Sequence, residues 1–91
     1  MTMVLHYNIK VTGKVQGVWF RDSTMKKASE LRINGFVRNE PDGSVYIEAE
    51  GEEDVLKKLT EWCWEGPERA KVNNVVAEIA TVINFKTFEI K

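Results

Sequence analysis

Two segments of the chain place their apolar residues with helical spacing, and each lies between segments whose apolar and polar residues alternate. Spacing of three and four residues is typical of a helix with one buried face, and alternation is typical of a strand with one covered face. The pattern predicts helices over residues 20–34 and 52–65, and strands over residues 5–12, 35–40, 45–50, 72–80 and 85–90.

The order of these elements limits the fold. Two helices with one apolar face each must cover one face of a single sheet. Right-handed crossovers then favour an α+β fold, the ferredoxin-like βαββαβ sandwich, with a mainly antiparallel sheet, two helices on one face and a short extra C-terminal strand. The other face of such a sheet is expected to be open to solvent. With 91 residues and no linker or repeat, residues 1–91 are expected to form a single domain.

Some finer expectations concern the first helix and the open face. The buried residues of the first helix are expected to be Phe20, Met25, Ala28 and Leu31, and Asn34-Gly35 is expected to end it, because both residue types tolerate left-handed backbone. His6, the only histidine, falls on the open face by its position in the alternation, and we expect it to be solvated. The acidic residues between Glu48 and Asp54 are expected to form a solvated edge and the start of a helix, so no metal site is predicted.

Charge is unevenly distributed along the chain. The formal net charge is only −1, which does not favour a nucleic-acid partner. Residues 10–38, however, contain seven basic and two acidic residues, so an anion site is expected in the first half. An RNA-binding domain of the same element order is an alternative, but Tyr46 would share the open face with Glu48 and Glu50, whose carboxylates repel phosphate.

The single cysteine bears on the compartment. Cys63 has no partner for an internal disulfide, which favours a reducing environment. The N-terminal residues do not resemble a signal peptide, and no segment approaches the ~20 apolar residues of a membrane helix. We therefore expect a cytoplasmic protein with no membrane partner.

The stretch from Gly13 to Arg21 joins the first strand to the first helix and is the most informative segment. Its glycines allow tight turns and close approach to a ligand. Backbone N–H groups before a helix N-terminus form a preorganised anion site, and an arginine in the first turn adds a two-pronged contact. From spacing alone, a structural turn with a solvated arginine remains an alternative. The segment matches neither the Walker nor the dinucleotide-binding pattern.

The residues Gly-Lys-Val-Gln-Gly-Val-Trp-Phe-Arg at 13–21 resemble the signature of the acylphosphatase family. Further blocks resemble the same family, and the resemblance extends over nearly all of the chain. These blocks are residues 35–39, residues 42–45, Gly66-Pro67 with residues 70–72, and the closing residues Phe85, Phe88 and Ile90.

This resemblance implies a small, metal-free and cofactor-free hydrolase that splits acyl phosphates into a carboxylate and inorganic phosphate. It implies that Arg21 and Asn39 are catalytic, and that Thr24 lies near the active-site water. The implied phosphate-binding residues are Val15, Gln16, Gly17, Val18, Trp19, Phe20 and Arg21. Inorganic phosphate is then expected as product and competitive ligand, and the protein is expected to be a monomer. The alternative is a catalytically idle module of the same family that binds a small anion or regulates.

Physical roles follow for these residues. Loop N–H groups and Arg21 would stabilise charge on the phosphoryl oxygens. Asn39 has no basic group, but its carboxamide can orient a water by donating and accepting hydrogen bonds. Two positions depart from the family pattern. Trp19 stands where phenylalanine or tyrosine is common, and Asp22 stands where a basic or polar residue is common. Since neighbouring helical residues diverge by about 100°, Asp22 is expected to face solvent.

Overall fold

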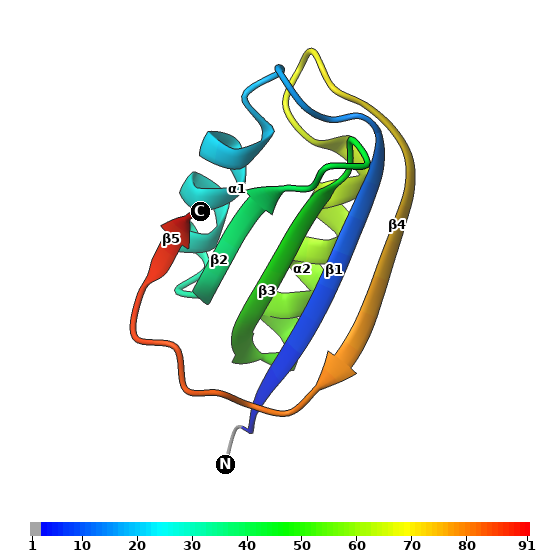
Figure 1. The fold of residues 1–91 in the computed structure, drawn as a ribbon. Helices are drawn as coiled ribbons and strands as arrows, with labels where there is room; N and C mark the ends of the chain where they lie inside the picture. The colour runs from blue at the N-terminus through cyan, green and yellow to red at the C-terminus, as the bar shows by residue number, and fades with distance from the viewer. Residues whose placement is uncertain (1–2) are drawn as a thin grey trace.

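The structure, a computed structural model, describes residues 3–91, in which the helices and strands follow one another in the predicted order (Figure 1). The elements are β1 (Val4–Lys14), α1 (Phe20–Glu30), β2 (Asn34–Asn39), β3 (Val45–Glu52), α2 (Glu53–Glu65), β4 (Lys71–Ala80) and β5 (Phe88–Ile90). The strands form one sheet in the order β4-β1-β3-β2-β5.

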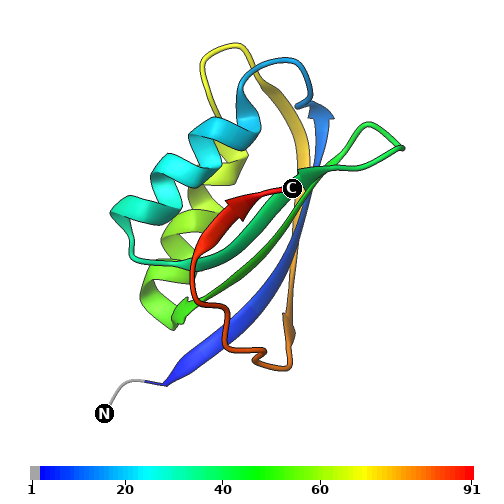
Figure 2. The same cartoon turned by 60° about the vertical axis from the view of Figure 1, so that its left-hand side comes forward.

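All neighbouring strands are antiparallel except β2 and β5, which are parallel. Ile9 of β1 lies opposite Ile47 of β3 at the centre of the sheet. Both helices cover the same face, as the turned view in Figure 2 shows. The predicted ferredoxin-like arrangement and the extra last strand are therefore confirmed, although that strand begins at Phe88 rather than at residue 85.

The core lies between the sheet and the helices, where alternating strand residues meet the apolar stripes of α1 and α2. Fully burying one such aliphatic side chain stabilises the fold by about 1.5–3 kcal/mol. The strands contribute Ile9, Val11, Val37, Val45, Ile47 and Ala49, and the helices contribute Phe20, Ala28, Leu56, Leu59 and Cys63.

The end of α1 differs from the prediction. The helix ends at Glu30 and Arg32 follows it in the left-handed conformation, with φ 57°, whereas Asn34 and Gly35 already belong to β2. The N–H of Ile33 donates to the carbonyl of Ala28 (2.9 Å), and the N–H of Arg32 donates to that of Ser29 (3.2 Å). This pair of bonds is a Schellman motif, which stops a helix and here turns the chain early enough to bury Ile33.

The buried face of α1 also differs. Phe20, Thr24 and Ala28, spaced by four, are buried, whereas Met25 is exposed and Leu31 is only partly buried. Thr24 can replace an apolar residue there because its hydroxyl donates to the carbonyl of Phe20 (2.7 Å). Burying this side chain therefore leaves no unpaired donor.

The helix-free face of the sheet is not as open as predicted. Residues 81–87 connect β4 to β5 across its lower end (Figures 1 and 2), and the carboxylate of Glu50 accepts hydrogen bonds from the N–H groups of Ile83 (2.5 Å) and Phe85 (2.8 Å). His6 lies beneath this segment and is 1% exposed. The expectations that His6 is solvated and that Glu50 belongs to a solvated edge are therefore wrong, because a connection distant in sequence covers both residues.

Neither helix of residues 3–91 combines the length and the apolar character that crossing a membrane would demand.

Candidate active site

The loop between β1 and α1 contains two residues with left-handed backbone. Gly17 has φ 73° and Trp19 has φ 68°. Trp19 directly precedes the first residue of α1, so the loop delivers the chain to the positive end of that helix. Among the backbone hydrogen bonds of turns and loops within residues 3–91, none has its donor in residues 15–20. The N–H groups of residues 15–20 are therefore not donated to other backbone groups of the loop, and an anion can accept hydrogen bonds from them.

A pocket of about 340 Å³ opens at this loop. It combines the loop and the first turn of α1 with residues from the ends of β2 and β5. Its lining residues are Val15, Gly17, Trp19, Phe20, Arg21, Asp22, Asn39 and Ile90. Arg21 and Asn39, which lie 18 positions apart in the sequence, are thus brought to one pocket.

Asn39 is the last residue of β2 and is partly buried. Its side-chain carbonyl oxygen Oδ1 is buried and has no hydrogen-bond partner within the described residues. An unsatisfied buried acceptor costs about 1–3 kcal/mol, and this oxygen lacks the hydrogen-bond donor that a buried acceptor needs.

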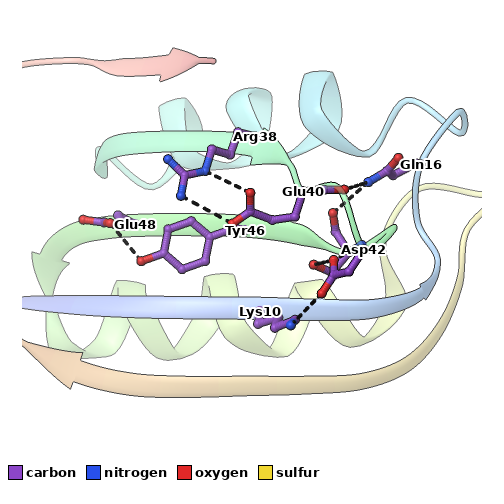
Figure 3. Close-up of polar contacts among 8 residues, drawn as sticks. Lys10, Gln16, Arg38, Glu40, Asp42, Tyr46 and Glu48 are labelled. Carbon is purple, nitrogen blue, oxygen red and sulfur yellow. Dashed lines mark hydrogen bonds and ion pairs between the residues drawn. The ribbon is translucent and has the colours of Figure 1, made fainter.

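The neighbouring Arg38 points elsewhere, since successive strand residues face opposite sides of a sheet. Its guanidinium pairs with the carboxylate of Glu40 (3.3 Å) and lies 4.9 Å from the centre of the Tyr46 ring (Figure 3). Of the two arginines in the signature-like blocks, only Arg21 lines the pocket.

The family model that matches this chain is Acylphosphatase, over residues 7–90. The chain belongs to the acylphosphatase family. An acylphosphatase of Marinobacter nauticus is 58% identical over 79% of this chain and 78% of its own length. One from Nitrosococcus oceani is 42% identical over 98% of this chain and 100% of its own length. The solved structure of an acylphosphatase from Coxiella burnetii has a TM-score of 0.94 at 44% identity, covering 97% of this chain and 93% of that one.

The protein is therefore an acylphosphatase, a hydrolase acting on acid anhydrides, and it hydrolyses acyl phosphates. The predicted family and the predicted activity are confirmed. The alternative of a catalytically idle module is not favoured by these relatives, which are themselves named acylphosphatases.

Two residues of the expected phosphate cradle do not line the pocket of this acylphosphatase. Val18 is buried, and the side chain of Gln16 is directed to the turn between β2 and β3, as Figure 3 shows. The Nε2 group of Gln16 donates to the carbonyls of Glu40 (2.8 Å) and Ser44 (2.9 Å). Gln16 thereby ties the loop to the turn that follows Asn39.

The turn that receives Gln16 is itself well connected. Asp42 Oδ1 accepts hydrogen bonds from the N–H (2.9 Å) and the hydroxyl (2.6 Å) of Ser44. Lys10 Nζ donates to Asp42 Oδ2 (2.9 Å), and these hydrogen bonds, first that from Lys10, hold the pKa of Asp42 well below its ordinary value. These hydrogen bonds hold the turn in one conformation. Through Gln16, the turn then fixes the position of the loop relative to the end of β2.

Thr24 and Asp22 lie differently from what the sequence suggests. Thr24 is absent from the pocket lining within the described residues, and its hydroxyl proton is donated within α1. Its part in an active-site water network stays a prediction. Asp22 is exposed, as expected, but it also lines the pocket, because the mouth of the pocket opens to solvent beside the first turn of α1.

Ile90 also lines the pocket, and no pattern in the sequence predicts a site role for it. The pattern of the closing segment predicts a strand, but alternation does not reveal which strand it pairs with. Parallel pairing with β2 places Ile90 opposite Val37 and brings the end of β5 to the pocket. Within residues 3–91, no three His, Cys, Asp or Glu side chains are grouped in a way that would hold a metal ion.

Proposed function

We propose that Arg21 and Asn39 divide the work of acyl phosphate hydrolysis, with Arg21 holding the phosphoryl group and Asn39 orienting the attacking water. The observation that carries this division is the buried Oδ1 of Asn39, which lacks a partner and belongs to a residue of the same pocket as Arg21. A water that donates to this oxygen is held with its own lone pairs free, and the amide N–H₂ group can fix a second contact.

Three features support phosphate binding beside the water. The guanidinium of Arg21 offers two parallel N–H donors to phosphoryl oxygens. The N–H groups of residues 15–20 are not used by the turns of the loop, and the positive end of α1 follows directly. Negative charge that develops on the phosphoryl oxygens would meet preorganised donors, which is the largest single contribution in many enzymes.

The proposed reaction is an in-line displacement. The oxygen of the water forms a bond to phosphorus, the bond between phosphorus and the acyl oxygen breaks, and the carboxylate leaves with the electron pair. The water proton passes to a phosphate oxygen. Because a carboxylate is a weak base, the leaving group needs no strong acid, and positioning with charge stabilisation can provide the rate.

We propose further that the reaction needs no metal or other cofactor, that inorganic phosphate is a competitive ligand, and that the chain works as one monomeric domain in the cytoplasm. The single cysteine, Cys63, has no partner for an internal disulfide, which favours a reducing compartment. Light scattering measured during size-exclusion chromatography tests whether the protein is a monomer. Turnover of benzoyl phosphate with and without a chelator tests the need for a metal, and loss of activity with the chelator would refute that part of the proposal.

The division of roles is tested with two variants and two measurements. Arg21→Gln should lower kcat/KM for benzoyl phosphate by about a hundredfold to a thousandfold, and phosphate should no longer inhibit it. Asn39→Ala should lower kcat similarly while the inhibition constant of phosphate changes little, because the water and not the phosphate loses its partner. Near-normal turnover by Asn39→Ala would show that the water is oriented by another group.

The phosphate cradle is tested by NMR. Titration with inorganic phosphate should shift the amide signals of residues 15–21, whereas the amides of α2 on its solvent side should stay in place. If the amide signals of residues 15–21 do not shift although phosphate still inhibits the enzyme, the anion binds elsewhere.

A further inference from the structure

The conformation of Trp19 demands an explanation that packing does not give. A bulky residue at φ 68° is a strained position that glycine or asparagine fills at much lower cost. Strain of this kind is found mainly where function requires it. Yet the side chain of Trp19 is 70% exposed, and it makes no stacking contact with another aromatic ring in residues 3–91.

Trp19 also does not serve α1 as a side-chain cap. Its backbone carbonyl accepts the N–H of Ser23 (3.0 Å), but its side chain makes no capping hydrogen bond. Within residues 3–91, the side chain of Trp19 therefore has neither a capping role nor a stacking role. The indole ring lies at the pocket, where it contributes apolar surface to the lining.

Ile90 supplies a second apolar surface to the same pocket from a different element. It is partly exposed, and it reaches the pocket only because β5 pairs with β2. The pocket thus has two kinds of lining. Arg21 and Asn39 are suited to a phosphoryl group and water, whereas Trp19 and Ile90 present surface with no charge and little hydrogen-bonding capacity.

An acyl phosphate has the same two kinds of surface, a charged phosphoryl group joined to an acyl group. The pocket volume of about 340 Å³ lies in the range of about 300–1,000 Å³ that is typical of small-molecule sites, and a phosphoryl group alone leaves much of it unfilled. A flat ring stacked against the indole of Trp19 would gain affinity beyond what the area that it buries provides.

Asp22 places a carboxylate at the pocket that disfavours some substrates. It lines the pocket and is not paired with any basic side chain in residues 3–91. An acyl group that carries its own carboxylate would meet this like charge, which disfavours such substrates.

We infer that Trp19 and Ile90 form an acyl-group subsite, and that this acylphosphatase prefers acyl phosphates whose acyl group is apolar and planar. This inference rests on the proposed placement of the phosphoryl group at Arg21. Because the subsite touches a part of the substrate that does not react, its contacts are made equally in the ground state and in the transition state, and they act mainly on KM.

The test compares benzoyl phosphate with acetyl phosphate in the wild type and in Trp19→Gly. Glycine keeps the loop N–H at position 19 and accepts the positive φ without strain, so the melting temperature should not fall. The ratio of kcat/KM values, benzoyl over acetyl, should fall about tenfold, mostly through KM for benzoyl phosphate. Ile90→Ala should lower the same ratio about threefold.

Two matched variants complete the test. Trp64→Ala removes a tryptophan that is 51% exposed on α2 and absent from the pocket, and it should leave the ratio unchanged. Asp22→Asn should raise kcat/KM for succinyl phosphate relative to benzoyl phosphate. If Trp19→Gly lowers both substrates equally, or lowers neither, the acyl subsite is refuted while the roles of Arg21 and Asn39 stand. If Arg21→Gln turns over both substrates normally, the placement of the phosphoryl group has failed instead.

Discussion

The imidazole of His6 and the carboxylate of Glu50 are joined by a hydrogen bond of 2.7 Å beneath residues 81–87. The second ring nitrogen of His6 contacts Asn8 Oδ1 (2.8 Å) and Glu48 Oε1 (3.1 Å). The carboxylate of Glu50 also accepts hydrogen bonds from the N–H groups of Ile83 and Phe85. The His6–Glu50 pair therefore holds the β4–β5 connection against the sheet. The connection leads into β5 and so to Ile90 at the pocket.

Glu50→Gln should lower the free energy of unfolding by about 2 kcal/mol at pH 7, because hydrogen bonds to a charged group are lost at a site that is 5% exposed. Burial alone would raise the pKa of Glu50, but the bonds from His6, Ile83 and Phe85 lower it below its ordinary value of 4.5. The ionised form is thus favoured in the folded state. Its contribution is complete above pH 4.5 and is lost as the pH falls through the lowered pKa.

Urea denaturation at several pH values measures this effect. The difference between the wild type and Glu50→Gln should shrink below about pH 4.5. Glu78→Gln is the matched control, since Glu78 is exposed on β4 and has no ion-pair partner in the described chain. An equal loss of stability in both variants would show that the fastening is not specific to Glu50.

Gln16→Ala should lower kcat/KM about tenfold while the free energy of unfolding falls by only about 1–2 kcal/mol. Two neutral hydrogen bonds, to the carbonyls of Glu40 and Ser44, are lost. The loop then loses its tie to the turn after Asn39, and small misplacement of binding groups is costly to catalysis. Steady-state kinetics and urea denaturation check the two values. Unchanged kcat/KM with the same loss of stability would show that the tie is structural only.

Gly35→Ala and Gly43→Ala should differ strongly in stability, although both glycines have positive φ. A Cβ on Gly35 would lie 1.8 Å from the carbonyl oxygen of Glu48 on the neighbouring strand, whereas a Cβ on Gly43 would meet nothing within 4 Å. We expect Gly43→Ala to cost about 1 kcal/mol and Gly35→Ala more than about 3 kcal/mol. Thermal unfolding checks the order, and equal costs would contradict the close approach of β2 and β3.

Rising salt should lower kcat/KM for benzoyl phosphate more than it lowers kcat. Residues 10–38 carry a net charge of +5 and include the loop and Arg21, so their field should attract the anionic substrate. Screening shortens the reach of this field from about 30 Å at 0.01 M salt to about 10 Å at 0.1 M. Kinetics over that range check the effect, and a kcat/KM independent of ionic strength would contradict it.

The order of elements and the layer arrangement could be predicted from alternation and helical spacing, because these patterns record which face of each element is buried. Arg21 could be predicted as a candidate anion ligand from its place at the start of a helix, with a solvated arginine as the alternative, whereas Asn39 could be predicted only through the resemblance of its block to the family. Asparagine is common before a turn, so its type alone does not indicate a site. That Asn39 Oδ1 is buried without a hydrogen-bond partner follows only from the three-dimensional structure.

The burial of His6 and the position of Ile90 could not be predicted in the same way. Both depend on residues 81–87, which contain no regular pattern and cross a face that alternation marks as polar. Thr24 shows the same limit on a smaller scale. Its hydroxyl is polar by composition, but a local hydrogen bond to Phe20 makes it acceptable in the core.

The parallel pairing of β5 with β2 also bears on when the enzyme becomes active. Ile90 follows the loop residues by about 70 positions and reaches the pocket only through that pairing. During synthesis, the sheet and helices up to β4 can collapse while one wall of the pocket is still missing. In a refolding experiment, recovery of the full kcat/KM for benzoyl phosphate should therefore not precede the docking of β5 on β2.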